Sequence, residues 1–113
     1  FISHSAPENV DRNGFDIGIF DRPLSDDDFV PSGPVFELVW GRDFRQENAD
    51  AFAALVDATV LIHGHEPCLS GFSVPNDKQI ILDCCGRRAC YLILPLDQEY
   101  SQAEMIDLIG HIS

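Results

Sequence analysis

Basic residues are scarce in this chain, and their scarcity restricts the partners it can bind. Its 113 residues include seven Lys and Arg against 19 Asp and Glu, which gives a formal net charge of −12. A surface of this charge repels the phosphates of nucleic acids and of anionic lipids. We therefore expect neither nucleic acid nor a membrane among its partners.

Cysteine pairs with the spacing of zinc or redox motifs are missing as well. The four cysteines are Cys68, Cys84, Cys85 and Cys90; none forms a CxxC pair, and two of them are adjacent. This pattern disfavours a disulfide framework and a structural zinc site, and it favours reduced thiols in a reducing compartment. The sequence therefore predicts a cytoplasmic protein.

The chain also lacks low-complexity runs, an apolar run of membrane-spanning length and a recognisable signal peptide. With 45% hydrophobic residues over this length, it is expected to form one globular domain, residues 1–113, or part of one. Because the sequence begins with Phe-Ile rather than Met, we expect a processed or excised piece of a translated chain.

The most informative segment is a short apolar run that ends at two histidines. Residues 58–67 have the sequence ATVLIHGHEP, which predicts a buried strand over residues 59–63 because the run is short and bounded by turn residues. Gly64 permits a turn or a close approach to a ligand. His63 and His65 then follow a strand at its carboxyl end, where α/β proteins bind ligands. They are candidate metal ligands; alternatively, one or both cap the strand or bond to the backbone.

Periodicity and turn signals predict a mixed α/β (α+β) fold. The expected strands are residues 1–4, 59–63, 69–74, 78–84 and 88–95, with the last three forming an antiparallel meander, and the expected helices are residues 46–57 and 101–109. Ser101 and Glu104 form a capping box at the start of the second helix, and Gly110 is expected to end it. His111 lies beyond that end and is given no chemical role.

Several smaller features complete the predicted organisation. Residues 15–34 are expected to form a long irregular excursion with one short helical turn, and residues 35–40 a short helix or buried turn. The acidic run at residues 26–28 is interpreted as a solvated face rather than a metal site. Strand alternation at Cys84 and Cys85 is expected to bury at least one of these thiols.

The segment LIHGHEP at residues 61–67 resembles the last metal-ligand motif of the calcineurin-like metallophosphoesterases. The most similar branch comprises the phosphoprotein phosphatases and the bacterial enzymes that cleave diadenosine tetraphosphate. Further segments match in the same order: residues 1–8 (FISHSAPE), 21–23 (DRP), 39–43 (VWGRD) and 81–86 (ILDCCG). The last match implies that Asp83 is structural and ties a turn near the site. The resemblance covers only the C-terminal half of that family's domain, and it implies part of a β-sandwich flanked by helices.

The resemblance implies specific roles for the histidines. The histidines of the family that match His4 and His65 bind the same one of two divalent cations, and imidazole suits Mn, Fe or Zn. We expect Mn as the cofactor, with Fe or Zn as alternatives. His63 is expected to support the metal ligands or to lie near the metal, and it is counted with Arg42 among the candidate catalytic residues.

The resemblance also implies a phosphorylated substrate, either a phosphoprotein or a dinucleotide polyphosphate. In the bacterial members an arginine after a Leu-Trp segment contacts the substrate phosphate, and Arg42 stands in the matching place. A planar guanidinium can bind two phosphate oxygens at once. Arg45 is the alternative substrate contact, and an ion pair with Asp43 or Glu47 is the competing interpretation.

The chain departs from the family in what it does not contain. The three earlier family motifs, Asp-x-His, Gly-Asp-x-x-Asp and Gly-Asn-His, are not found between residues 1 and 113. Two histidines cannot hold a dinuclear centre. We therefore expect an incomplete metal-dependent phosphoesterase that is inactive alone and that needs the missing N-terminal half of its own domain as partner. The alternative is a non-catalytic binding module that retains the fold.

Overall fold

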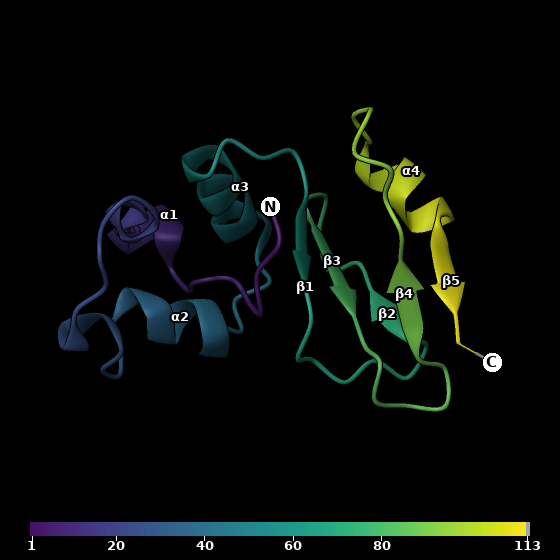
Figure 1. Cartoon of the computed structure of the whole chain (residues 1–113), viewed down its shortest axis with the longest axis horizontal. Coiled ribbons are helices and arrows are strands. Elements are labelled where there is room, and N and C mark those ends of the chain that lie inside the picture. The colour runs from purple at the N-terminus through teal and green to yellow at the C-terminus, as the bar shows by residue number, and fades with distance from the viewer. Residues whose placement is uncertain (113) are drawn as a thin grey trace.

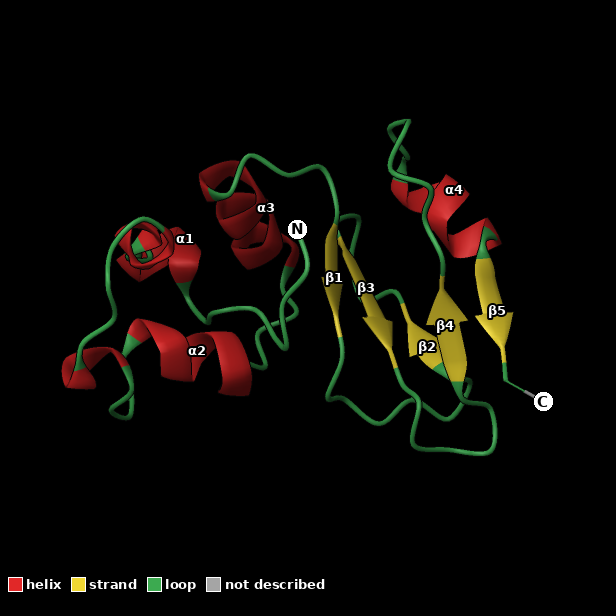
Figure 2. Ribbon diagram, viewed as in Figure 1, coloured by secondary structure: helices red, strands yellow, loops and turns green. Residues whose placement is uncertain are grey.

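The computed structural model describes residues 1–112 as a mixed α/β fold, which confirms the predicted α+β class (Figures 1 and 2). Helical elements come first along the chain. They are α1 (Val10–Asn13), the 3₁₀ turns η1 (Ile17–Phe20) and η2 (Asp26–Asp28), α2 (Pro34–Trp40) and α3 (Gln46–Leu55). The remainder consists of β1 (Leu61–His63), β2 (Phe72–Ser73), β3 (Gln79–Leu82), β4 (Cys90–Leu92), α4 (Gln102–Asp107) and β5 (Ile109–His111).

The strands form two small sheets rather than the predicted meander. In the three-stranded sheet the order is β1-β3-β2, with β1 parallel and β2 antiparallel to β3. β4 pairs instead with β5, an antiparallel partner that the sequence did not predict. The predicted antiparallel pairing of residues 69–74 with 78–84 is confirmed by β2 and β3, whereas the predicted place of β4 beside β3 was wrong. β1 takes that place, because Ile62 of β1 and Ile80 of β3 are register partners and belong to the same hydrophobic cluster.

Each predicted strand after β1 is shorter in the structure than in the sequence prediction. β2 covers only the end of residues 69–74 because the chain still turns at Gly71, where φ is 89° and a Cβ would lie 1.9 Å from the carbonyl oxygen of Arg88. β3 stops before residues 83 and 84 because the Asp83 carboxylate accepts backbone N–H bonds from Cys68 and Cys85, which bends the chain there.

This early end of β3 also overturns the prediction for the cysteines. Cys84 and Cys85 lie beyond the strand in the connection to β4, and both are exposed, so strand alternation does not bury either thiol. Cys90, the first residue of β4, is the buried one. No disulfide joins any of these residues.

The helices agree better with the sequence. α3 follows its predicted apolar periodicity and ends two residues early, before Asp57 adopts the left-handed conformation with φ of 52°. The capping box at the start of α4 is present, with Glu104 accepting the Ser101 N–H and Ser101 Oγ accepting the Glu104 N–H. α4 ends at Asp107, and Gly110 lies in β5 because this segment pairs with the edge of β4.

The excursion at residues 15–34 holds two 3₁₀ turns instead of one helical turn. Within the acidic run, Asp26 and Asp27 are exposed as predicted, whereas Asp28 is buried. Both Asp28 oxygens accept hydrogen bonds from Arg22, at 2.6 and 2.8 Å, so this carboxylate anchors the loop.

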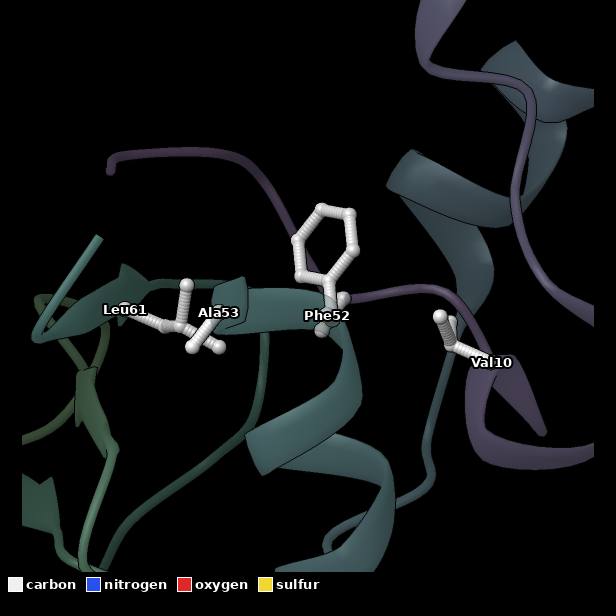
Figure 3. Close-up of a cluster of buried hydrophobic side chains, with 5 residues drawn as sticks. Val10, Phe52, Ala53 and Leu61 are labelled. Carbon is white, nitrogen blue, oxygen red and sulfur yellow. The ribbon is translucent and has the colours of Figure 1, made fainter. Parts of the chain in front are cut away.

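The hydrophobic core has two parts that meet at β1. Leu61 packs with Phe52, Ala53 and Val10 in one cluster (Figure 3), whereas its neighbours on the strand, residues 60 and 62, join Ile80 in the other cluster. Successive residues of a strand point to opposite faces, so β1 is covered on both sides, as its continuous apolar sequence predicted.

A buried amide fixes α3 to the preceding polypeptide. Asn48 is fully buried; its Oδ1 accepts the Val10 N–H at 2.7 Å, and its Nδ2 donates to the Pro7 carbonyl oxygen at 2.8 Å. Buried polar groups need such partners, so this side chain holds the segment after His4 in place.

In residues 1–112, no helix has the length and apolar content required to cross a membrane.

Candidate functional site

The first residues of the chain run parallel to β1 and bring two distant histidines together. Ile2 forms a parallel bridge with Ile62; the Ser3 N–H donates to the Ile62 carbonyl oxygen at 3.1 Å, and the Gly64 N–H donates to the His4 carbonyl oxygen at 3.2 Å. The chain entering from the N-terminus lies beside β1 in Figure 1. The predicted strand at residues 1–4 is therefore present as a short paired segment, and His4 and His65 emerge at the same end of it.

The rings of His4 and His65 face each other at this end. Their centroids are 4.2 Å apart with an angle of 47° between the planes. The backbone of His65 is left-handed, with φ of 64°, a conformation that is costly for a residue with a Cβ. Trp40 at the end of α2 packs edge-on against the His65 ring, with 5.4 Å between centroids. These contacts hold the two imidazoles side by side.

The electrostatic surroundings favour the neutral form of His4. Burial lowers the pKa of His4, and the charges of His65 and Arg42 lower it further. A neutral imidazole is the form that ligates a metal. Within residues 1–112, the ring nitrogens of His4 and His65 form no hydrogen bond.

His63 has a different environment from the exposed pair. It is 4% exposed, and its Nδ1 lies 3.1 Å from Ser3 Oγ. Because the Ser3 hydroxyl donates its proton to the Ser5 carbonyl oxygen at 2.7 Å, the bond with His63 uses an N–H on Nδ1. The Nε2 of His63 is buried without a hydrogen-bond partner, and burial lowers the pKa of this imidazole to about 4. His63 is thus neutral near pH 7.

Arg42 lies close enough to the histidines to affect the pKa of His4. Its Nε donates to Glu66 at 2.7 Å, and its backbone N–H donates to Glu8 at 2.8 Å. Glu66 directly follows His65, so this ion pair ties the arginine to the histidine loop. Neither contact was predicted from the sequence: Glu66 was known only as the residue after His65, and Glu8 only as the last residue of the matched segment 1–8.

Arg45 forms the type of contact that was its competing interpretation. It binds Asp43 at 2.7 Å, as one alternative predicted, and Asp11 at 2.9 Å in place of Glu47. Hydrogen bonds to these two carboxylates raise the pKa of Arg45 well above its usual range. Its guanidinium therefore braces α1 against the loop that precedes α3.

The donor set fits part of a metal site. Two imidazoles on a fixed backbone suit a divalent transition metal. No group of three or more His, Cys, Asp or Glu side chains in residues 1–112 is arranged to hold a metal ion. Asp83, which was expected to be structural, spends both oxygens on the backbone N–H groups of its loop. The described residues therefore bring two imidazoles together, and no third ligand among residues 1–112 joins them.

Sequence reasoning missed Trp40 as a neighbour of the site. Its only sequence signal was its position two residues before Arg42, because its contact with His65 depends on how α2 packs against the histidine loop.

Comparisons of the chain with protein-family models, with curated proteins and with solved structures gave no match.

Proposed function

We propose that this chain contributes part of the active site of a metal-dependent phosphoesterase. In this site His4 and His65 bind one divalent cation, Mn²⁺ in the first instance, and Arg42 binds the substrate phosphate. The observation that supports it best is the 4.2 Å approach of the two imidazoles from separate segments of the chain. The remaining ligands come from residues outside this sequence, in the N-terminal half of the same domain.

The environment of each histidine distinguishes the metal-ligand interpretation from the alternative of strand capping. His63 is buried and bonded to Ser3, as a structural histidine would be. His4 and His65 are exposed and lie at neighbouring carboxyl ends, and their ring nitrogens have no hydrogen-bond partner in residues 1–112. Retaining His65 in a left-handed conformation has an energetic cost, and such strain concentrates at functional positions.

Arg42 has the chemistry and the position to bind phosphate beside the histidines. When present, the cation supplies Lewis-acid activation of the phosphoester and of water. The role of the chain is to hold the cation with His4 and His65 and to orient the phosphate with the planar guanidinium of Arg42. Phosphate binding requires Arg42 to exchange its bond with Glu66 for phosphate oxygens. Both a phosphoprotein and a dinucleotide polyphosphate satisfy this requirement.

A cytoplasmic location is part of the same proposal. It is supported by the four unpaired thiols, two of them exposed, which are typical of a reducing compartment.

A second candidate is a non-catalytic binding module. It is favoured by the incomplete ligand set and by large apolar side chains that remain exposed, among them Ile2 at 74% and Leu96 at 97%. Such side chains can form a protein interface.

Titration with Zn²⁺ and Mn²⁺, followed by NMR of the imidazole protons, tests the proposed metal site. We expect weak binding, because two imidazoles fill only half of a tetrahedral shell, with shifts at His4 and His65. His65→Ala should abolish these shifts. His111→Ala is the matched control, because this histidine lies in β5 and bonds to the Arg88 carbonyl oxygen. Binding that survives His65→Ala, or that is lost equally in the His111 variant, would contradict the assignment.

A further inference from the structure

A cavity lies at the same end of the sheet as the histidine pair, His4 and His65. It has a volume of about 470 Å³ and is formed by two loops, one following β1 and the other joining β3 to β4. The two loops run next to each other below the strands in Figure 1. Pro67, Cys68 and Leu69 line one side of the cavity, and Arg87 and Arg88 line the other.

Backbone contacts fix the shape of this cavity. The two loops approach so closely that a Cβ on Gly71 would lie 1.9 Å from the Arg88 carbonyl oxygen. The Nδ1 atom of His111, a residue of β5, lies 3.2 Å from the same oxygen. The Asp83 carboxylate joins the loops by accepting the N–H groups of Cys68 and Cys85. The arginines are therefore carried on a backbone that is held from several sides.

Arg87 and Arg88 are exceptions in a chain rich in carboxylates. The other four arginines all form ion pairs: Arg12, Arg22, Arg42 and Arg45. In residues 1–112, by contrast, no carboxylate lies within ion-pairing distance of Arg87 or Arg88. Two adjacent guanidinium groups thus remain available on a molecule of net charge −12.

The other polar groups of the cavity do not neutralise the two arginines. Asp83 is the one acidic side chain among the lining residues, and its oxygens are occupied by backbone N–H groups. Burial raises the pKa of the Cys68 thiol, and the neighbouring Cys84 raises that of Cys85, so both thiols remain uncharged near pH 7. The cavity lining therefore contains the positive charges of Arg87 and Arg88 and one negative charge, that of Asp83, which already accepts two backbone N–H bonds.

We propose that Arg87 and Arg88 form a binding site for a phosphate group that carries an apolar substituent. The guanidinium pair supplies planar donors that match phosphate oxygens. Leu69, which is fully exposed at the rim, supplies an apolar surface for the organic part of the ligand.

The position of this cavity relates it to the histidine pair. Pro67, in its wall, is two residues from His65, so their Cα atoms lie within about 7.6 Å of each other. Under the proposed function, the two sites would serve one substrate that carries two phosphate groups, one bound at Arg42 and the other at Arg87 and Arg88. This relation rests on the proposed function, whereas the binding of phosphate at the arginines does not.

The test uses inorganic phosphate and phenyl phosphate as probes, with NMR of the whole chain as readout: the arginine Nε–H groups in the unchanged protein, and the backbone amides of the two loops in every variant. We expect saturable shifts at Arg87 and Arg88, with phenyl phosphate binding several-fold more tightly than inorganic phosphate. Leu69→Ser should remove that preference. The double variant Arg87→Gln/Arg88→Gln should bind at least about tenfold more weakly, which is the usual effect of losing charged hydrogen bonds.

The control Arg12→Gln/Lys78→Gln removes the same number of positive charges elsewhere on the surface. It should bind phosphate as the unchanged protein does, and an equal loss in both double variants would overturn the proposal. Arg87→Lys/Arg88→Lys retains the charge and should keep part of the affinity. His65→Ala should leave the arginine shifts intact. Shifts confined to Arg42 and the histidines would refute the second site while sparing the first.

Discussion

At the scale of single residues, the backbone of His65 decides how the candidate site is arranged. A left-handed residue after Gly64 turns the chain so that the His65 ring lies over that of His4 and against Trp40. Glycine would adopt this conformation at no steric cost, whereas histidine pays about 1–2 kcal/mol for it. Histidine at position 65 is therefore less favourable for stability than glycine would be, but it supplies an imidazole.

This strain predicts the relative stability of two substitutions at position 65. We expect His65→Gly to be about 0.5–1 kcal/mol more stable to urea unfolding than His65→Ala, because relief of the left-handed strain exceeds the entropy cost of glycine. The same pair at Asp50, within α3, serves as a control and should show the opposite order, since alanine favours a helix. If alanine is the more stable variant at both positions, residue 65 is not held in the left-handed conformation.

At the scale of elements, the excursion at residues 15–34 depends on one ion pair, between an exposed arginine and a buried carboxylate. Arg22 donates to both oxygens of Asp28, and the Ser25 N–H donates to the same carboxylate at 2.7 Å. These bonds, those from Arg22 first, hold the pKa of Asp28 well below its usual range. A carboxylate whose pKa is depressed in the folded state stabilises the fold above its unfolded pKa, and this contribution fades as the pH falls.

Asp28→Asn should therefore destabilise the protein most at neutral pH. The urea midpoint of this variant should lie below that of the unchanged protein by a constant amount above about pH 5. This difference should shrink as the pH drops below about 4, the unfolded pKa of an aspartate. The measurement is urea unfolding over this pH range. Asp27→Asn, at the exposed neighbour, should have little effect at any pH. A pH-independent difference for Asp28→Asn would show that its charge does not stabilise the loop.

The connection between β3 and β4 predicts the reactivity of the four thiols. Cys84 and Cys85 are exposed and should react rapidly with a thiol reagent in the native protein, the second more slowly because its neighbour's charge raises its pKa. Cys90 is buried and should react only after denaturation, and burial should slow Cys68. Cys84→Ser/Cys85→Ser should eliminate the fast reaction. Four fast thiols in the native state would contradict the burial of Cys90.

At the scale of the whole molecule, the proposed site remains incomplete, and this predicts the activity of the isolated chain. We expect no turnover of p-nitrophenyl phosphate or diadenosine tetraphosphate with Mn²⁺, because two ligands hold the cation weakly and each tenfold loss of rate represents about 1.4 kcal/mol. A longer chain that supplies the remaining ligands should turn over substrate. In it, His65→Ala should abolish kcat, whereas Arg42→Ala should mainly raise KM. Turnover by the isolated chain that persists in His65→Ala would refute the proposal.

The sequence by itself determined the features that depend on neighbouring residues. The apolar periodicity of α3, the Ser101–Glu104 capping box and the burial of β1 on both faces are each encoded within a few consecutive residues. The carboxyl-end position of His65 follows from the same local pattern, since a strand must end where Gly64 and Pro67 interrupt it. Local propensity and side-chain period were sufficient for these predictions.

Only the tertiary structure decided which distant groups meet. The pairing of β4 with β5 and the ion pair of Arg45 with Asp11 each join segments whose local sequences carry no record of the partner. The same holds for the 4.2 Å contact of His4 with His65, which the sequence suggested only through resemblance. Long-range contacts form where burial and charge are satisfied over the whole chain, so the local pattern of either partner does not fix them.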